Sequence, residues 1–205
     1  IRKNVKSKAY PKHVAKILII RRNRLGDSIN VLPIIEAIKK NYPSIKISVL
    51  ANQYNAEIFS YSNDINKVYC INEKWGLGRI TLYLNPTVRK LRQENFDLVI
   101  GLGGFASMLS QISYCIKGKY SVGPESPEGN FNDLLFDFTV KKIQGKNNLH
   151  VDEMANIVKG ARLKLPKKLP FPKLNVTITK KKNWLAICPD VNRKESRYST
   201  TAARN

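Results

Sequence analysis

The strongest pattern of apolar positions lies between Ala15 and Lys40. Ile17 to Ile20 form a continuous apolar run that is too short for a helix, which indicates a parallel strand covered on both faces. From Ile29 to Ile38 the apolar residues recur at steps of three and four, the spacing of one face of a helix. Pro33 lies inside this second pattern and predicts a kink or a delayed start of the helix.

Apolar runs and helical periods continue to alternate along the rest of the chain. Further strands are predicted at 45–50, 67–71, 97–100, 120–122 and 136–140. Helical segments are predicted at 53–59, at 79–95 with an interruption at Pro86, after Gly104 to about Lys117, and from His150 onward. We interpret His150 itself as a structural residue. Strands that alternate with helices predict an α/β fold, a Rossmann-like parallel sheet with helices on both faces.

Charge divides the chain into segments. It has 205 residues with 36 Lys and Arg against 15 Asp and Glu, a formal net charge of +21 that predicts attraction to polyanions. Residues 2–16 hold six basic side chains and no acid, and residues 159–182 hold nine and no acid. We therefore expect a basic N-terminal arm at 1–15, a Rossmann-like domain at 16–163, a Lys/Pro-rich linker at 164–182 and the start of a second domain at 183–205.

Neither a membrane span nor a metal site is expected. No stretch approaches the roughly 20 apolar residues that a span needs, and no segment resembles a signal peptide, so the expected location is cytoplasmic. Cys70, Cys115 and Cys188 are far apart and odd in number, which indicates reduced core residues rather than disulfides or a zinc site. We expect no metal and no cofactor.

The loop after the first strand is the main candidate for chemistry. In an open α/β sheet such a loop faces the ligand crevice, and it places charged side chains at the rim of a site: Arg21, Arg22, Arg24 and Asp27. Gly26 is expected to allow a tight turn into the helix. A carboxylate beside a crevice can accept a proton, but Asp27 or Ser28 can equally cap the helix. The residues alone leave both interpretations open.

This stretch resembles a known family. The pattern Arg-x-x-x-Leu-Gly-Asp from Arg21 to Asp27, followed by Pro33 and an amphipathic helix, is similar to the opening signature of glycosyltransferase family 9, which contains the lipopolysaccharide heptosyltransferases. The resemblance continues, in the family's order, with YPSIKISVLANQYNAEIF, NFDLVIGLGG, LHVDEMANIVKGARLKL and WLAICPDVNRKESRY. It spans about Ala15 to Tyr198.

The resemblance implies the N-terminal half of a GT-B type glycosyltransferase. Residues 16–163 would be the acceptor-binding domain, and 183–205 the truncated start of the nucleotide-sugar-binding domain, so the chain is expected to be inactive alone. The implied reaction transfers a sugar, such as heptose from ADP-heptose, to a lipopolysaccharide core acceptor with inversion.

The resemblance also assigns roles to residues of this chain. Asp27 would be the catalytic base, and the acceptor would be bound by Arg21, Arg22, Arg24 and Gly26. For the donor diphosphate the family has a Lys two residues before an aromatic residue, where this chain has Ser196 before Tyr198. Lys194 and Arg197 are the nearby cations that could take its place.

The fourth predicted strand is followed by three glycines, Gly101, Gly103 and Gly104. A glycine-rich loop at a helix start can bind phosphate, but the full dinucleotide spacing is absent. We expect these glycines to allow close approach of an acceptor or of the following helix.

The implied partners are a lipopolysaccharide core or other saccharide acceptor, an ADP-sugar donor only if the second domain is present, and an anionic membrane surface contacted peripherally. Two rival readings remain. One is a basic α/β module that binds nucleic acid or anionic lipid, and the other is a decayed gene product. No nucleic-acid recognition motif is found, so no specific nucleic acid is expected.

Overall fold

The computed structural model describes residues 8–22, 25–71, 79–103, 106–126, 131–141, 143 and 150–175. The strands are β1 (Lys16–Ile20), β2 (Lys46–Asn52), β3 (Lys67–Ile71), β4 (Leu98–Gly101), β5 (Tyr120–Pro124) and β6 (Phe138–Val140). The helices are α1 (Leu25–Ile29), α2 (Leu32–Asn41), α3 (Ala56–Ser60), α4 (Arg79–Leu84), α5 (Pro86–Gln93), α6 (Ala106–Ile116), the 3₁₀ helix η3 (Phe131–Leu135) and α7 (His150–Gly160).

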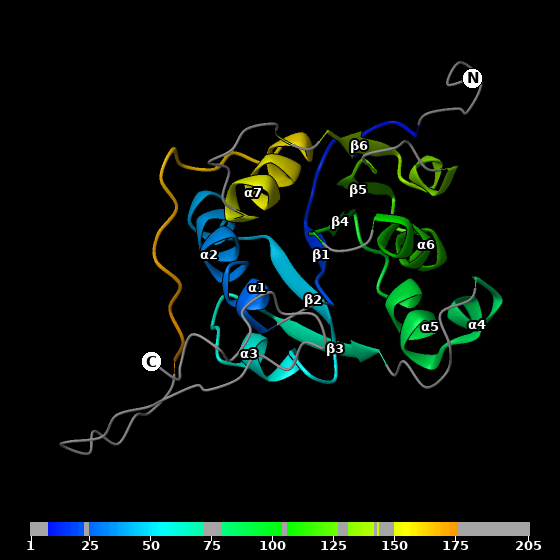
Figure 1. The fold of residues 1–205 in the computed structure, drawn as a ribbon, viewed down its shortest axis with the longest axis horizontal. Helices are drawn as coiled ribbons and strands as arrows, with labels where there is room; N and C mark the ends of the chain where they lie inside the picture. The colour runs from blue at the N-terminus through cyan, green and yellow to red at the C-terminus, as the bar shows by residue number, and fades with distance from the viewer. Residues whose placement is uncertain are drawn as a thin grey trace, which may run out of the picture. The chain divides into compact units, whose positions relative to one another are not determined.

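The described strands form one parallel sheet in the order β3-β2-β1-β4-β5-β6 (Figure 1). β1 lies in the middle, and its last residue, Ile20, is level with Leu50 of β2 and Gly101 of β4. The chain winds outward from β1 in one direction through β2 and β3, and in the other through β4, β5 and β6. In such a sheet the crevice for ligands opens where the winding reverses, outside the carboxyl ends of β1 and β4.

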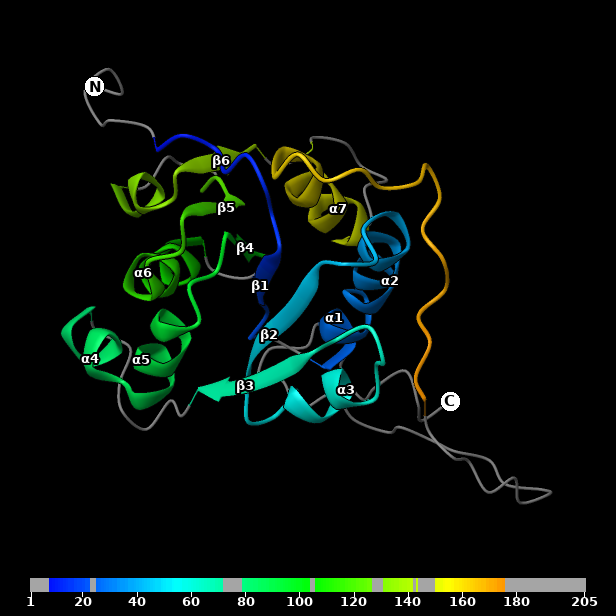
Figure 2. The same cartoon turned by 180° about the vertical axis from the view of Figure 1, so that it is seen from behind.

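Two apolar layers cover the sheet. Ile17 and Ile19 of β1 point to one face, where they pack with residues of α2, α3 and α7. Leu18 and Ile20 point to the other face, where they pack with residues of α4, α5 and α6. Figures 1 and 2 show these helices on opposite sides of the strands. The predicted parallel α/β fold with helices on both faces is confirmed.

The helix predicted after β1 is divided in two. α1 ends at Ile29, and α2 begins at Leu32 with Pro33 in its first turn, so the predicted delayed start is confirmed. Proline is tolerated there because the first amides of a helix have no partner within it. The prediction that Asp27 or Ser28 caps this helix is wrong, since both lie inside α1 and the N-cap of α2 is Val31, which makes no side-chain cap.

Two other predictions have different outcomes. The interruption at Pro86 is present, because α5 starts there and Asn85 caps it by accepting hydrogen bonds from the amides of Thr87 and Val88.

The expectation that the cysteines lie in the core is wrong for Cys70, which is exposed. Successive side chains of a strand point to opposite faces, and that of Cys70 points away from the buried face that holds Tyr69 and Ile71. Cys115 is buried, and Cys188 lies outside the described residues.

Residues 164–175, the described part of the predicted linker, lie along the domain. Asn41 Nδ2 donates to the Lys164 carbonyl at 2.8 Å, and the Lys164 amide donates to the Tyr42 hydroxyl at 3.1 Å. Further on, the Asn175 amide donates to the Tyr61 carbonyl at 3.0 Å. This segment therefore runs from the end of α2 to the end of α3. The remainder of the predicted linker, the predicted second domain and residues 1–7 lie outside the described residues.

Candidate functional site

A buried arginine stands where the winding of the sheet reverses. Arg21 follows β1 directly, and its side chain is 1% exposed. Its Nη1 donates to the Leu102 carbonyl after β4 at 2.6 Å, and its Nη2 lies 2.7 Å from Asp27 Oδ2 in α1. A guanidinium removed from water needs such partners, because an uncompensated buried charge is strongly destabilising. Arg21 thus joins the segments that follow β1 and β4, and it holds Asp27, whose side chain is 28% exposed.

A histidine from the far end of the chain completes this group. His150 is the first residue of α7, and its Nε2 lies 3.4 Å from Arg21 Nη2 and 3.9 Å from Asp27 Oδ2. Its Nδ1 lies 3.3 Å from Glu153 Oε2, one turn further along α7. The sequence suggested only a structural histidine. The His-x-x-Glu spacing was the one available signal, and it does not reveal which loop α7 meets.

Gly103 provides the space for this arrangement. Its φ is +68°, a left-handed conformation that favours glycine. A Cβ at this position would overlap Arg21 Nη1 and would lie 3.2 Å from His150 Nε2. Close approach was the expected role of these glycines, but the group that approaches is the Arg21 guanidinium.

Two asparagines at the end of β2 hold the backbone of the β1 loop. Asn55 is fully buried, and its Nδ2 donates to the Arg21 carbonyl at 3.2 Å and to Ser28 Oγ at 2.7 Å. Asn52 Nδ2 donates to the Arg22 carbonyl, and Asn55 Oδ1 accepts from the Asn52 amide at 3.0 Å. Sequence reasoning did not identify either residue, although both lie in the segment that resembles the family. Their hydrogen bonds satisfy the backbone carbonyls of two buried residues, Arg21 and Arg22.

The remaining predicted site residues have separate positions. Arg22 is 5% exposed, and its Nη1 contacts Met108 Sδ of α6 at 2.7 Å, so it is not joined to Asp27. The expected turn at Gly26 is not found, because Gly26 lies inside α1 outside the left-handed region, and a Cβ there would have no neighbour within 4 Å. Arg24, Lys194 and Arg197 lie outside the described residues.

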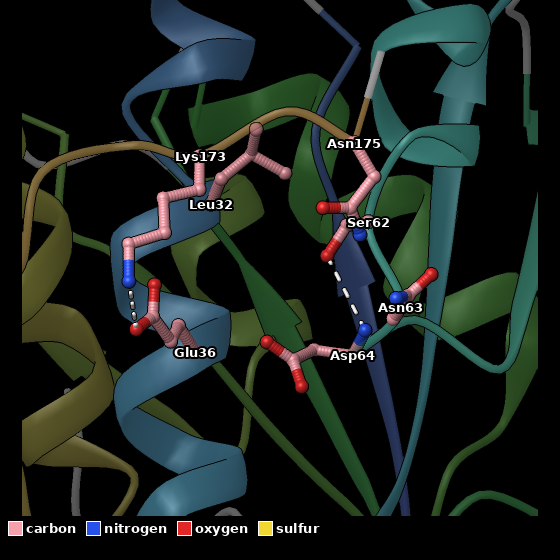
Figure 3. Close-up of a pocket in the computed structure, with 7 residues that line it drawn as sticks. All are labelled: Leu32, Glu36, Ser62, Asn63, Asp64, Lys173 and Asn175. Atoms are coloured by element: carbon pink, nitrogen blue, oxygen red, sulfur yellow. Dashed lines mark hydrogen bonds and ion pairs between the residues drawn. The ribbon is translucent and has the colours of Figure 1, made fainter. Parts of the chain in front are cut away.

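A separate polar pocket of about 330 Å³ lies between α2, the loop after α3 and the end of the described chain (Figure 3). Its lining residues are Leu32, Glu36, Ser62, Asn63, Asp64, Lys173 and Asn175. Lys173 Nζ lies 3.7 Å from Glu36 Oε1, so these two charges are paired across it. The pocket contains none of the residues around Asp27. Within the described ranges, no cluster of His, Cys, Asp and Glu is arranged to hold a metal ion.

Similar sequences are lipopolysaccharide heptosyltransferases, although no family profile matches the chain. Lipopolysaccharide heptosyltransferase 3 of Escherichia coli K12 is 38% identical over 79 residues, and a second E. coli protein of that name is 35% identical over 78 residues. Each match covers 38% of this chain and 23% of the relative. The chain thus matches about a quarter of the length of these relatives.

Solved structures extend the similarity in space. E. coli heptosyltransferase WaaC with ADP superposes with a TM-score of 0.61 at 17% identity, over 75% of this chain and 49% of WaaC. E. coli ADP-heptose lipopolysaccharide heptosyltransferase II gives 0.60 at 19% identity, over 79% and 47%. A family 9 glycosyltransferase from Veillonella parvula gives 0.59 at 19% identity, over 73% and 42%. The described chain therefore has the α/β fold of the family 9 heptosyltransferases, over about half the length of these solved proteins.

Proposed function

We propose that this chain carries the acceptor-binding half, with the catalytic base, of an inverting glycosyltransferase. The reaction would transfer a sugar, in the first instance heptose from ADP-heptose, to a saccharide of the lipopolysaccharide core. The observation that carries the proposal is the Arg21 and Asp27 ion pair at the carboxyl ends of β1 and β4, where this fold opens its crevice. The similarity in sequence to two lipopolysaccharide heptosyltransferases supports it.

Asp27 is suited to act as the base. Arg21 holds Oδ2, whereas Oδ1 has no hydrogen-bond partner among the described contacts. In an inverting transfer Oδ1 would accept the proton of the acceptor hydroxyl while the oxygen attacks the anomeric carbon and the nucleoside diphosphate leaves from the opposite face. The amide of an asparagine could keep the contact with Arg21 but could not take the proton.

The acceptor-binding roles differ in their structural support. Gly26 leaves open space beside Asp27, which suits a saccharide that must approach closely. Arg21 is buried and would act by holding Asp27 and by making the crevice positive, rather than by surface contact. Roles for Arg22 in acceptor binding, for Arg24 in the same task and for Lys194 and Arg197 in donor binding rest on the family resemblance alone.

The donor is proposed to bind mainly outside the described residues. WaaC was solved with ADP, and this chain covers 49% of that protein. A second domain, which binds the nucleotide, would hold the ADP-sugar opposite Asp27. We therefore propose that the ADP-sugar binds productively only where that domain is present.

The test is the substitution Asp27→Asn in a protein that joins residues 1–175 to a donor-binding domain. We expect transfer to fall by at least ~100-fold, the usual loss when an acid–base group is removed. The variant should still fold but should be less stable than wild type, because the buried Arg21 loses the charge of its partner. Asp152→Asn, at an exposed position of α7, is the matched control and should keep normal turnover. Near-normal turnover of Asp27→Asn would remove Asp27 as the base.

We also propose a peripheral contact with an anionic membrane through a surface of α4 and α6. Its exposed apolar residues are Ile80 (76% exposed), Leu84 (56%), Tyr83 (42%) and Tyr114 (53%). The Arg92 guanidinium and the Lys117 ammonium lie over the Tyr83 ring, 4.0 and 5.5 Å from its centroid. Apolar side chains next to cations suit the boundary between acyl chains and anionic headgroups. None of the described helices is long and apolar enough to cross a membrane.

Vesicle sedimentation tests this contact. The double substitution of Ile80 and Leu84 by Ser should reduce binding to vesicles with anionic lipid, because it removes the apolar part of the surface. Phe171→Ser, at a residue that is 83% exposed and lies along α2, controls for the general loss of an exposed apolar side chain. Equal binding of both variants would exclude the α4 and α6 surface, and equal binding to uncharged vesicles would exclude the role of the cations.

A further inference from the structure

We propose that His150, held in its Nδ1–H form by Glu153, is a positioning residue that acts on Asp27 through the Arg21 guanidinium. The functional part of this inference rests on the proposed function, in which Asp27 is the base. The geometric part follows from contacts alone. His150 and Glu153 belong to α7, and His150 contacts Arg21, the residue that follows β1, so α7 would be part of the site as well as a cover for the sheet.

The contacts of the ring select one tautomer. An ionised carboxylate only accepts hydrogen bonds, so the 3.3 Å contact between His150 Nδ1 and Glu153 Oε2 requires the proton on Nδ1. In the neutral ring Nε2 is then an acceptor. It faces Arg21 Nη2 at 3.4 Å, and a guanidinium only donates. The two contacts, made on opposite sides of the ring, therefore agree on the same tautomer.

Arg21 Nη2 can serve both neighbours because it carries two hydrogens. One is available for Asp27 Oδ2 at 2.7 Å and the other for His150 Nε2 at 3.4 Å, while Nη1 donates to the Leu102 carbonyl at 2.6 Å. The guanidinium is thus held from α1, from α7 and from the loop after β4. Rotation about its terminal bonds would break at least one of these contacts.

Holding Arg21 fixes the orientation of Asp27. With Oδ2 directed to Arg21, Oδ1 is left for the acceptor hydroxyl. Gly103 fits the same purpose, since any side chain there would displace the guanidinium or the imidazole. The chain from Glu153 through His150 and Arg21 to Asp27 would therefore set the direction in which the base accepts its proton.

Nitrogen NMR on the 205-residue chain tests the tautomer directly. The chain has two histidines, and exposed His13 serves as an internal control. At about pH 8, where an ordinary imidazole is neutral, long-range ¹H–¹⁵N correlations should show His13 mainly in the Nε2–H form that predominates in water and His150 in the Nδ1–H form. An Nε2–H form at both histidines would overturn the inference, and this result does not depend on any variant.

Two variants of Glu153 test the cause. Glu153→Gln keeps an acceptor oxygen and should retain the Nδ1–H form, whereas Glu153→Ala should return His150 to the Nε2–H form. His150→Ala should speed the exchange of the Arg21 Nη protons about fivefold, the factor that one hydrogen bond of ordinary strength corresponds to. An unchanged tautomer in Glu153→Ala, or unchanged Arg21 exchange in His150→Ala, would contradict the positioning role.

Titration of the same samples with a core saccharide separates this inference from the proposed function. If His150 is in the Nδ1–H form but the saccharide perturbs neither Arg21 nor Asp27, the proposed function fails while the contact chain stands. If the saccharide binds and His150 is in the Nε2–H form, the positioning inference alone fails.

Discussion

Arg21 determines the chemistry of its neighbours because it is a full charge with almost no contact with water. Its side chain is 1% exposed, so its hydrogen bonds to Leu102 and its ion pair with Asp27 replace hydration. Gly103 and Asn55 support it from two sides, one by leaving space and the other by fixing its carbonyl. The residues that support Arg21 can therefore be tested by substitution, as Asp27 can.

Gly103→Ala is expected to destabilise the protein by about 1 to 3 kcal/mol, because a non-glycine residue is strained at positive φ and the new methyl group displaces Arg21. Gly26→Ala is the matched control. It lies in a helix with open space around it, so we expect unchanged or slightly higher stability. Urea unfolding of both variants measures the difference. Similar stability of the two variants would show that Gly103 is not constrained by Arg21.

Elements are held in register at the opposite, amino-terminal edge of the sheet by Asp97. Its Oδ2 accepts hydrogen bonds from the amides of Ala15 and Lys16 at 2.8 and 2.9 Å, and its Oδ1 accepts from Lys119 Nζ at 2.7 Å. One carboxylate thereby joins the starts of β1, β4 and β5. Burial by itself would raise the pKa of Asp97, but the hydrogen bonds from Lys119, Ala15 and Lys16 outweigh it and hold the pKa below its ordinary value.

Asp97→Asn should therefore lower the free energy of unfolding by about 1 to 3 kcal/mol at neutral pH, since an amide cannot accept the same set of hydrogen bonds. The folded-state pKa is below the unfolded one, so the stabilisation is present above the unfolded pKa and is lost as the pH falls through the folded pKa. Urea unfolding at several pH values should show the difference from wild type shrinking in acid. Asp152→Asn, exposed on α7, should show no such trend. A constant difference at every pH would contradict this account.

At the scale of the whole molecule, the charge of +21 and the proposed site beside Asp27 make different predictions for different ligands. Charge gives weak, unspecific attraction to any polyanion, and added salt screens it. In the proposed function, selective binding of a saccharide comes from the site beside Asp27, and an ADP-sugar needs the contacts of the proposed donor domain.

Isothermal titration of the 205-residue chain separates these contributions. We expect a phosphorylated core saccharide to bind weakly and in a salt-sensitive way, and an ADP-sugar to show no saturable binding. Transfer should also be absent. Holding both substrates in line lowers the activation barrier by on the order of 7 to 11 kcal/mol, and a chain that binds only one substrate does not gain this reduction. A random duplex DNA at the same ionic strength is the control for charge alone. Saturable micromolar binding of an ADP-sugar would place the donor site in this domain.

The sequence alone determined the sheet, because local patterns carry the required information. Buried parallel strands give continuous apolar runs such as Ile17 to Ile20, and covering helices show a period of three and four. Strand β3 was predicted with its observed limits, and Pro86 divides two helices as expected. The Arg21 to Asp27 motif located the loop at the crevice, since a parallel sheet places strand ends of this kind at one edge.

Only the tertiary structure decided what that loop contacts. His150 lies beside Asp27, and Gly103 accommodates Arg21, because α7 and the end of β4 fold onto the end of β1 from distant parts of the chain. Arg22 looked like a neighbour of Asp27 in sequence, yet it reaches Met108 on the helix layer over the other face. These contacts exist because β1 and β4 are neighbours in the sheet although they lie far apart in the sequence. The local pattern of residues around Arg21 does not show which distant segment will pair with β1.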